Sequence, residues 1–275
     1  MIGIFDSGAG GLSVWKEIIA SVPQEKIIYI SDSAFCPYGP KNPDQVIARS
    51  IKISQYLIDK GADIIVVACN TATAAAIQTL REKFAIPIVG MEPAIKPAAF
   101  STKSKVIGVL ATKGTFKGEL YLNTSKLYTQ NIKVIEQIGE GLVELVEEGA
   151  QKTPRAEELI RKYIEPMIQE GADNIVLGCT HYPFLSGVIE KVTQGKVRII
   201  NPAPAVAKRV MELYTPIKSK VEREERKNKI CTTGSSYKVL KSLANEILKE
   251  LKDKEILTES QLQPFLNQKY ETIKI

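Results

Sequence analysis

The chain has 275 residues, of which 44% are hydrophobic and 25% are charged, and its formal net charge is +6. This composition is typical of a globular protein and excludes a mainly disordered or low-complexity chain. No apolar run approaches the roughly 18 residues that indicate a transmembrane helix, and no basic leader precedes the first apolar segment. We therefore expect a cytoplasmic protein with no membrane partner.

Much of the positive charge lies in residues 218–229, which also contain three glutamates. A run of mixed sign is typical of a solvated surface, so we predict no nucleic-acid partner. The four cysteines, at positions 36, 69, 179 and 231, have no CxxC spacing, and His181 is the single histidine. Because closely spaced Cys and His ligands are missing, we predict no metal and no cofactor.

Short apolar runs alternate with helical patterns along the chain. In the first half the expected strands are 3–5, 27–30, 64–68 and 86–89, and the expected helices are 12–22, 43–60 and 71–84. The second half repeats the rhythm, with strands at 106–110, 132–135, 174–177, 197–200 and 230–232, and with helices from about 116 and at 155–170, 205–214 and 236–251. The strands lack polar alternation, which predicts parallel sheets covered on both faces by helices. The tail after Lys252 has too weak a pattern for an assignment.

An internal repeat links the two halves. Residues 60–70 match residues 170–180 through a shared Gly-Ala-Asp, an apolar run and then Cys69 or Cys179, which lie 110 positions apart. Two more matches fall at nearly the same offset, Pro93 with Pro202 and Gly3 with Gly108. Any two βα units share some similarity, but a cysteine at the same strand end favours a duplication.

The repeated cysteines indicate chemistry at two faces of one ligand. Ligands of parallel α/β sheets bind beyond the carboxyl ends of the strands, where Cys69 and Cys179 both lie. Racemisation needs a base on one face of a tetrahedral carbon and an acid on the other. A free thiol, with a pKa of about 8.5, suits both tasks. We predict that the two sulfurs lie roughly 7 Å apart, too far for a disulfide.

Polar residues follow each cysteine at a strand-to-helix junction. Asn70 and Thr71 follow the first thiol, and Thr180 and His181 follow the second. Backbone amides and polar side chains at such junctions can hold a carboxylate. His181 is suited to tune Cys179 or to assist its proton transfer, although a purely structural histidine is the alternative.

Two further loops should border the same cleft. The turn Asp6–Gly11 is not a dinucleotide fingerprint, because Ser13 stands where that motif needs glycine. Asp6 and Ser7 open this turn. Asp6 is a candidate partner for a substrate ammonium group, with helix capping as the alternative. In the loop after the second strand, Tyr38 offers a hydroxyl and Gly39 an amide. Cys36 and Cys231 have no repeated counterpart, so we expect them to be uninvolved.

These segments resemble the cofactor-independent aspartate/glutamate racemase superfamily, and within it the members that act on glutamate. The matching motifs span residues 2–210 and are Asp6-Ser7-Gly8-Ala9-Gly10-Gly11-Leu12, Cys36-Pro37-Tyr38-Gly39, Cys69-Asn70-Thr71-Ala72, Ala111-Thr112-Lys113-Gly114-Thr115 and Gly178-Cys179-Thr180-His181-Tyr182-Pro183. The family's Cys-Pro and Pro-Leu-Val-Glu segment is replaced here by residues 137–147, in which Glu147 fits the final acidic position.

The resemblance implies an α/β fold of two pseudo-symmetric, flavodoxin-like parallel-sheet domains with the active site in the cleft between them. One domain comprises residues 1–97 plus 208–275, and the other comprises residues 98–207. The implied catalytic residues are Cys69, Cys179, His181 and Asp6, and the implied substrate contacts are Asp6, Ser7, Tyr38, Gly39, Asn70, Thr71, Thr180 and His181. The resemblance further implies interconversion of L- and D-glutamate without a cofactor, a supply of D-glutamate for peptidoglycan and cell shape, and a homodimer.

Three alternatives stay open at this point. The substrate could be aspartate or another acidic amino acid, because the sequence does not fix the side-chain length that fits. The chain could be a small-anion-binding protein on the same scaffold, although a binder needs no paired thiols. A thiol oxidoreductase is disfavoured because CxxC spacing is missing.

Overall fold

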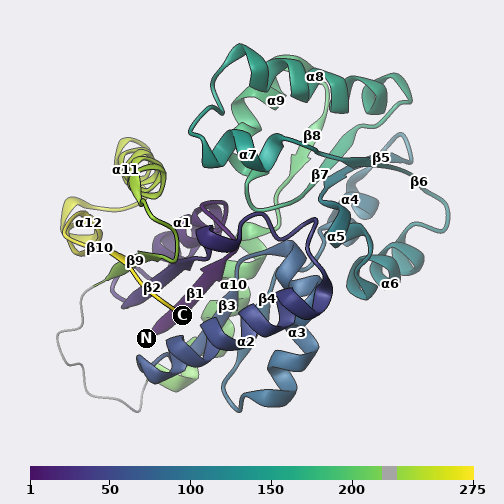
Figure 1. Ribbon diagram of the computed structural model, residues 1–275. Coiled ribbons are helices and arrows are strands. Elements are labelled where there is room, and N and C mark those ends of the chain that lie inside the picture. Colours follow the sequence, from purple (N-terminus) through teal and green to yellow (C-terminus); the bar gives the residue numbers. More distant parts are fainter. Residues whose placement is uncertain (219–227) are drawn as a thin grey trace.

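The structure is a computed structural model that describes residues 1–218 and 228–275. The basic stretch predicted to be a solvated surface, residues 218–229, lies almost wholly outside the described residues. Two separate sheets organise the chain, each covered by helices on both faces (Figure 1). No helix within the described ranges combines the length and apolar character needed to cross a membrane.

The first sheet has six strands in the order β10-β9-β2-β1-β3-β4, and every neighbouring pair is parallel. These strands are β1 (Ile2–Asp6), β2 (Ile27–Ser31), β3 (Ile64–Val67), β4 (Ile88–Gly90), β9 (Lys229–Thr232) and β10 (Lys269–Thr272). All residues of the central strands β1, β2 and β3 are buried. Such burial on both faces explains their continuous apolar pattern.

Helices α2 (Pro43–Asp59) and α3 (Asn70–Lys83) pack against each other and cover one face of this sheet. The other face is covered by α1 (Leu12–Ser21) and α10 (Ala203–Lys218), with α11 (Lys238–Asp253) against α1. Helix α12 (Glu259–Leu266) packs on α11. The chain thus returns to the first sheet after building the second.

The second sheet has four parallel strands in the order β6-β5-β7-β8. They are β5 (Val106–Ala111), β6 (Lys133–Ile138), β7 (Asn174–Gly178) and β8 (Arg198–Ile200). Helices α8 (Pro154–Gln169) and α9 (Ser186–Thr193) cover one face, and α4 (Ile95–Ser101) and α6 (Glu119–Tyr128) cover the other. Short helical segments connect these elements, namely η1 (Ser33–Phe35), α5 (Lys113–Phe116), α7 (Leu142–Glu147) and η2 (Tyr182–Leu185).

The two sheets share one connectivity. Strands β2-β1-β3-β4 of the first sheet correspond in order to β6-β5-β7-β8 of the second. This order is that of the flavodoxin-like doubly wound fold, so the predicted fold class is confirmed. Cys69 follows β3 and Cys179 follows β7, which are equivalent strands. Helix α10, which begins at Ala203, packs on α1. The division into 1–97 plus 208–275 and 98–207 stays a prediction.

Two local expectations differ from the structure. The single helix expected from about residue 116 is instead two helices, α5 and α6, which are separated at Gly118. The tail after Lys252, which we left unassigned, forms α12 and the edge strand β10. Helix α12 begins with a capping box in which Thr258 and Gln261 each accept a hydrogen bond from the other's backbone. Strand β10 lies at the edge of the sheet and has no buried residue, so its sequence lacks the continuous apolar run of a central strand.

Candidate active site

Cys69 lies at the boundary between β3 and α3, where it caps the helix. Its Sγ accepts a hydrogen bond from the Ala72 N–H at 3.5 Å and lies 3.7 Å from Ser7 Oγ. The first amides of a helix have no partner within the helix, and they stabilise negative charge placed before them. This position therefore suits a sulfur that carries charge for part of a reaction cycle.

Asp6 lies at the end of β1, directly beside β3, and its side chain is fully buried. Its Oδ2 accepts a hydrogen bond from the Gly11 N–H at 2.8 Å. Burial raises the pKa of Asp6, although His181 and hydrogen bonds from Cys69 and Gly11 oppose this effect. Burial and the adjacent Asp6 also raise the pKa of the Cys69 thiol well above its usual value. Asp6 and Cys69 thus form a buried pair in which both groups favour their protonated forms.

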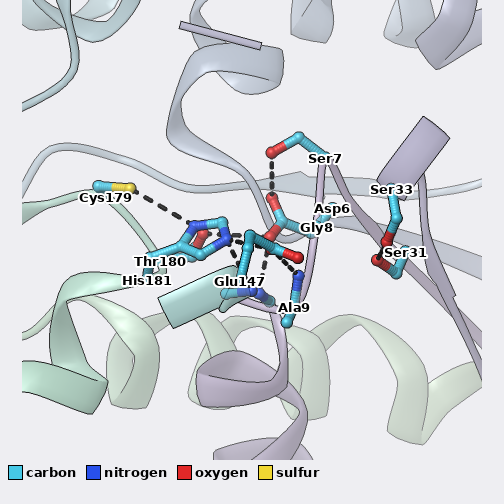
Figure 2. Close-up of polar contacts among 12 residues, drawn as sticks. Asp6, Ser7, Gly8, Ala9, Ser31, Ser33, Glu147, Cys179, Thr180 and His181 are labelled. Atoms are coloured by element: carbon cyan, nitrogen blue, oxygen red, sulfur yellow. Dashed lines mark hydrogen bonds and ion pairs between the residues drawn. The ribbon is translucent and has the colours of Figure 1, made fainter. Parts of the chain in front are cut away.

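Cys179 has a different partner. Its Sγ lies 3.7 Å from His181 Nδ1, and the opposite ring nitrogen, Nε2, lies 2.7 Å from Glu147 Oε1 (Figure 2). Burial alone would lower the pKa of His181, but contacts with Cys179, Cys36 and Glu147 outweigh burial and raise it well above its usual value. Burial alone would raise the pKa of Glu147, but hydrogen bonds from His181 and Ala9 lower it. The second thiol is therefore paired with an imidazolium and a carboxylate.

The glycine-rich turn after β1 holds both sets of groups together. The Ala9 N–H donates to Glu147 Oε1 at 2.6 Å (Figure 2). The Gly10 nitrogen lies 3.2 Å from His181 Nε2. A Cβ on Gly10 would lie 2.3 Å from His181 Nδ1. Glycine is required here because any side chain would displace the imidazole.

Thr180 joins the two halves as well. Its carbonyl accepts a hydrogen bond from Ser13 Oγ at 2.9 Å, and its own hydroxyl lies 3.4 Å from Asp6 Oδ2. These bonds connect the turn that follows β7 to the turn that follows β1. The carboxyl ends of the two sheets are therefore fixed against each other at the site.

A cavity of about 320 Å³ opens between the two halves. Both thiols line it, together with the predicted contacts Ser7, Tyr38, Gly39, Asn70, Thr71, Thr180 and His181. Asp6 is absent from the lining. Its roles in catalysis and in substrate contact both stay predictions. Tyr38 is held in place by a 2.5 Å hydrogen bond to Asp32, which also forms a buried ion pair with Arg49.

Asn70 gives the clearest sign that the cavity is built for a polar ligand. Its side chain is 4% exposed and lines the cavity, yet neither its Oδ1 nor its Nδ2 has a hydrogen-bond partner within the described residues. Buried amides without partners are costly and rare. A ligand that offers both an acceptor and a donor at this wall would satisfy Asn70.

Comparison with known proteins agrees with this geometry. The sequence profile of the family described as Asp/Glu/Hydantoin racemase matches residues 2–210. The chain belongs to this family. Among curated relatives, the glutamate racemase of Methylococcus capsulatus is 47% identical over 207 residues, which cover 75% of this chain and 76% of the relative. The protein is accordingly a racemase, and thus an isomerase.

Solved racemase structures share its whole fold. Glutamate racemase isoform RacE1 from Bacillus anthracis is 34% identical with a TM-score of 0.76, covering 90% of this chain and 94% of its own. Escherichia coli glutamate racemase, in complex with L-glutamate and the activator UDP-MurNAc-Ala, is 28% identical with a TM-score of 0.80. The match covers 99% of this chain and 97% of the E. coli enzyme.

Several residues that line the candidate site were not among the predicted substrate contacts. Thr112 and Lys113 line the cavity, and Thr112 Oγ1 lies 2.9 Å from Thr71 Oγ1. Both residues follow β5, the counterpart of β1, so the repeat itself was the signal that could have indicated them. Two acidic residues of the second half, Glu140 and Glu144, also line the cavity.

Cys36 is the residue whose position departs most from expectation. We expected it to be uninvolved, but the fold brings its Sγ beside His181 and Glu147, with the three potential ligand atoms within 4.8 Å of one another. These residues lie far apart in sequence, so cysteine spacing could not reveal the cluster. Cys231, by contrast, is buried within β9 of the first sheet.

Proposed function

We propose that this racemase interconverts L- and D-glutamate by a two-thiol mechanism that needs no cofactor. The observation that carries the proposal is the position of Cys69 and Cys179. They follow equivalent strands of two equally connected sheets and line one cavity. Two proton carriers on opposite sides of one small ligand are what inversion at a carbon requires.

For D-glutamate, we propose that the carboxylate form of Asp6 first accepts the thiol proton of Cys69, since burial raises the pKa of Asp6 and so makes its carboxylate a stronger base. The resulting thiolate, held by the Ala72 N–H, removes the α-proton of the substrate. Cys179 then donates its own proton to the opposite face, and the imidazolium of His181 replaces the proton that Cys179 has lost. One proton leaves the substrate and one enters it, so L-glutamate is formed. Asp6 then holds one more proton and His181 one fewer, and exchange with solvent returns both groups to their starting state. L-glutamate follows the reverse course.

The lining offers two groups of substrate contacts. Ser7, Asn70, Thr71 and Thr180 surround the thiols, and we propose that they bind the α-carboxylate and ammonium groups. The unpaired amide of Asn70 supports this assignment, since a carboxylate and an ammonium supply the acceptor and donor it lacks. We propose that Tyr38 and the Gly39 amide bind the side-chain carboxylate.

Glutamate is favoured over aspartate as the substrate. Curated relatives that are 42–47% identical are glutamate racemases, and the E. coli neighbour was solved with L-glutamate. A panel of acidic amino acids followed by circular dichroism would test this choice. Faster racemisation of aspartate than of glutamate would replace it.

The decisive experiment is α-proton exchange in D₂O, followed by NMR on L- and D-glutamate with no cofactor added. We expect deuterium at Cα together with conversion of either enantiomer to the racemate. Tight glutamate binding without any exchange would instead favour an anion-binding protein. Loss of activity after treatment with a metal chelator would contradict the cofactor-free mechanism.

In the cell, we propose that the product D-glutamate supplies peptidoglycan synthesis. Rescue of a bacterium that requires D-glutamate would test this role, with the Cys69→Ala variant as the matched negative control.

The mechanism needs free thiols, which the reducing cytoplasm maintains, so we propose a cytoplasmic location. The homodimer also remains a proposal, and light scattering of the purified protein measures it directly.

A further inference from the structure

We propose that Cys36, Glu147 and His181 form an inhibitory site for a divalent cation of the Zn²⁺ type, whose binding stops the Cys179 half of the reaction. The binding site stands on geometry alone, whereas the inhibition rests on the proposed two-thiol function. The three residues come from separate elements: the loop after η1, the end of α7 and the turn after β7.

The distances fit such a cation with little movement. Cys36 Sγ, a Glu147 oxygen and a His181 nitrogen lie within 4.8 Å of one another, and His181 Nε2 lies 2.7 Å from Glu147 Oε1. Zinc bonds of about 2.0–2.3 Å in a tetrahedron set ligand atoms roughly 3.3–3.8 Å apart. The cation would therefore replace the hydrogen bond between imidazole and carboxylate and draw the thiol inward.

The ligand set also selects the cation. Thiolate and imidazole favour Zn²⁺ and Co²⁺ over Mg²⁺ and Ca²⁺, which prefer oxygen ligands. Three protein ligands leave a fourth position for water, as in many zinc sites. No thiol–imidazole–carboxylate set of this kind is needed to hold glutamate, and Cys36 is not part of the cavity lining.

The proposed cation site can be reached from solvent, and the lack of a side chain at Gly8 leaves room beside two of its ligands. Cys36 is partly exposed, and the Glu147 side chain is 24% exposed. Between them lies Gly8, where a Cβ would stand 2.0 Å from Glu147 Oε1 and 2.9 Å from Cys36 Sγ. The Ala9 N–H holds the Glu147 carboxylate from the other side. A cation can thus enter from solvent toward a carboxylate that is already oriented.

Binding changes protons but not oxidation states. The cation displaces the thiol proton of Cys36 and the proton on His181 Nε2, and both are released to the buffer. The imidazole keeps its remaining proton on Nδ1, which faces Cys179 Sγ at 3.7 Å. The metal-bound imidazole can then neither accept a proton from Cys179, as the L-glutamate direction requires, nor readily give up its Nδ1 proton, as the D-glutamate direction requires, so inversion stops. Asp6 and Cys69 are not ligands and keep their function.

Co²⁺ is the probe for the site, because a thiolate bound to Co²⁺ gives a charge-transfer absorption band. We expect wild-type protein to develop this band at one equivalent and Cys36→Ser to lack it. Cys231→Ser, which removes a thiol from β9 and outside the proposed site, should retain it. Cys36→Ala repeats the test without a hydroxyl, and thermal denaturation verifies that each variant folds. A band that survives in both Cys36 variants, or that disappears in Cys69→Ser, would overturn the site.

Zn²⁺ inhibition then tests the consequence. Zn²⁺ should abolish racemisation by wild type and Cys231→Ser, and Cys36→Ser should keep at the same free Zn²⁺ the turnover that it has without Zn²⁺. Equal inhibition of Cys36→Ser would overturn the proposal. Should the protein show no racemisation even without Zn²⁺ while its cobalt band still depends on Cys36, the proposed function would fail and the metal site would stand.

Discussion

The two thiols occupy equivalent positions in the two sheets, but their surroundings differ in charge. Cys69 is paired with Asp6, and both groups have raised pKa values because they are buried together. Cys179 is paired with His181, whose pKa is raised by contacts with Cys179, Cys36 and Glu147. The internal repeat places the two thiols at equivalent strand ends, but the charged side chains beside them differ. In the first half the proton is held by the neutral pair of Asp6 and Cys69. In the second half it is held by the imidazolium of His181.

The difference in charge around the two thiols cannot appear as a difference in kcat/KM between the two enantiomers. The two enantiomers of free glutamate have equal free energy, so kcat/KM must be the same in both directions. Any asymmetry between the thiols must appear in kcat and KM separately, or in exchange without inversion.

The largest effect is expected from removing either thiol. Cys69→Ala and Cys179→Ala should each lower racemisation by about 10²–10⁴-fold or more, the usual contribution of a positioned acid or base. The remaining thiol can still deprotonate one enantiomer and return a solvent proton to the same face. We therefore expect Cys179→Ala to exchange the α-proton of D-glutamate in D₂O without inversion, and Cys69→Ala to do so with L-glutamate. Exchange of both enantiomers by either variant would refute the assignment of faces.

Sequence alone predicted the paired thiols and the fold class because both depend on local, repeated patterns. The Gly-Ala-Asp match and the apolar strands require no knowledge of distant contacts. The asymmetry was harder to predict. His181 adjoins Cys179 in sequence, but Glu147 reaches it only through α7, and the Ala9 amide reaches Glu147 from the first half. Cys36 could not be assigned either, because its neighbours come from loops whose paths depend on tertiary packing.

The next effect concerns the close approach of the glycine-rich turn to His181. In Gly10→Ala the new Cβ would lie 2.3 Å from Nδ1, so the imidazole must move away from Cys179. A displacement of about 1 Å at a reacting group can cost about 10²-fold in rate. We expect that loss in kcat with an unchanged melting temperature. Gly187→Ala is the matched control, since its Cβ would meet nothing within 4 Å. An equal loss of kcat in Gly10→Ala and Gly187→Ala would contradict the role of the close contact between Gly10 and His181.

A smaller effect is expected from Glu147→Gln. The amide can still accept the Ala9 N–H bond, but it no longer stabilises a cationic His181. Loss of one charge-assisted hydrogen bond costs about 1.5 kcal/mol, which corresponds to about tenfold in rate. Steady-state kinetics should show this loss in kcat, while exchange of D-glutamate through Cys69 continues. Impaired exchange through Cys69 would mean that the two halves do not act separately.

The smallest effect concerns stability and tests the Asp6 side of the comparison. Because burial raises the pKa of Asp6, the folded state retains its proton at pH values where the unfolded chain has lost it. Stability from this group is fully present below the usual Asp pKa of about 3.9 and is lost as the pH rises through the raised value. Asp6→Asn removes this loss and should stabilise the inactive protein at neutral pH by about 1 kcal/mol, or a few degrees in Tm.

Thermal denaturation of the wild type and Asp6→Asn across a pH series measures this gain. The difference in Tm should grow from acid toward neutral pH. A gain that is constant with pH would mean that the carboxyl of Asp6 is not the source. In that case Asp6 would carry an ordinary charge in the folded state. It would then be a poor acceptor for the Cys69 proton, and the two thiols would have to be distinguished by His181 alone.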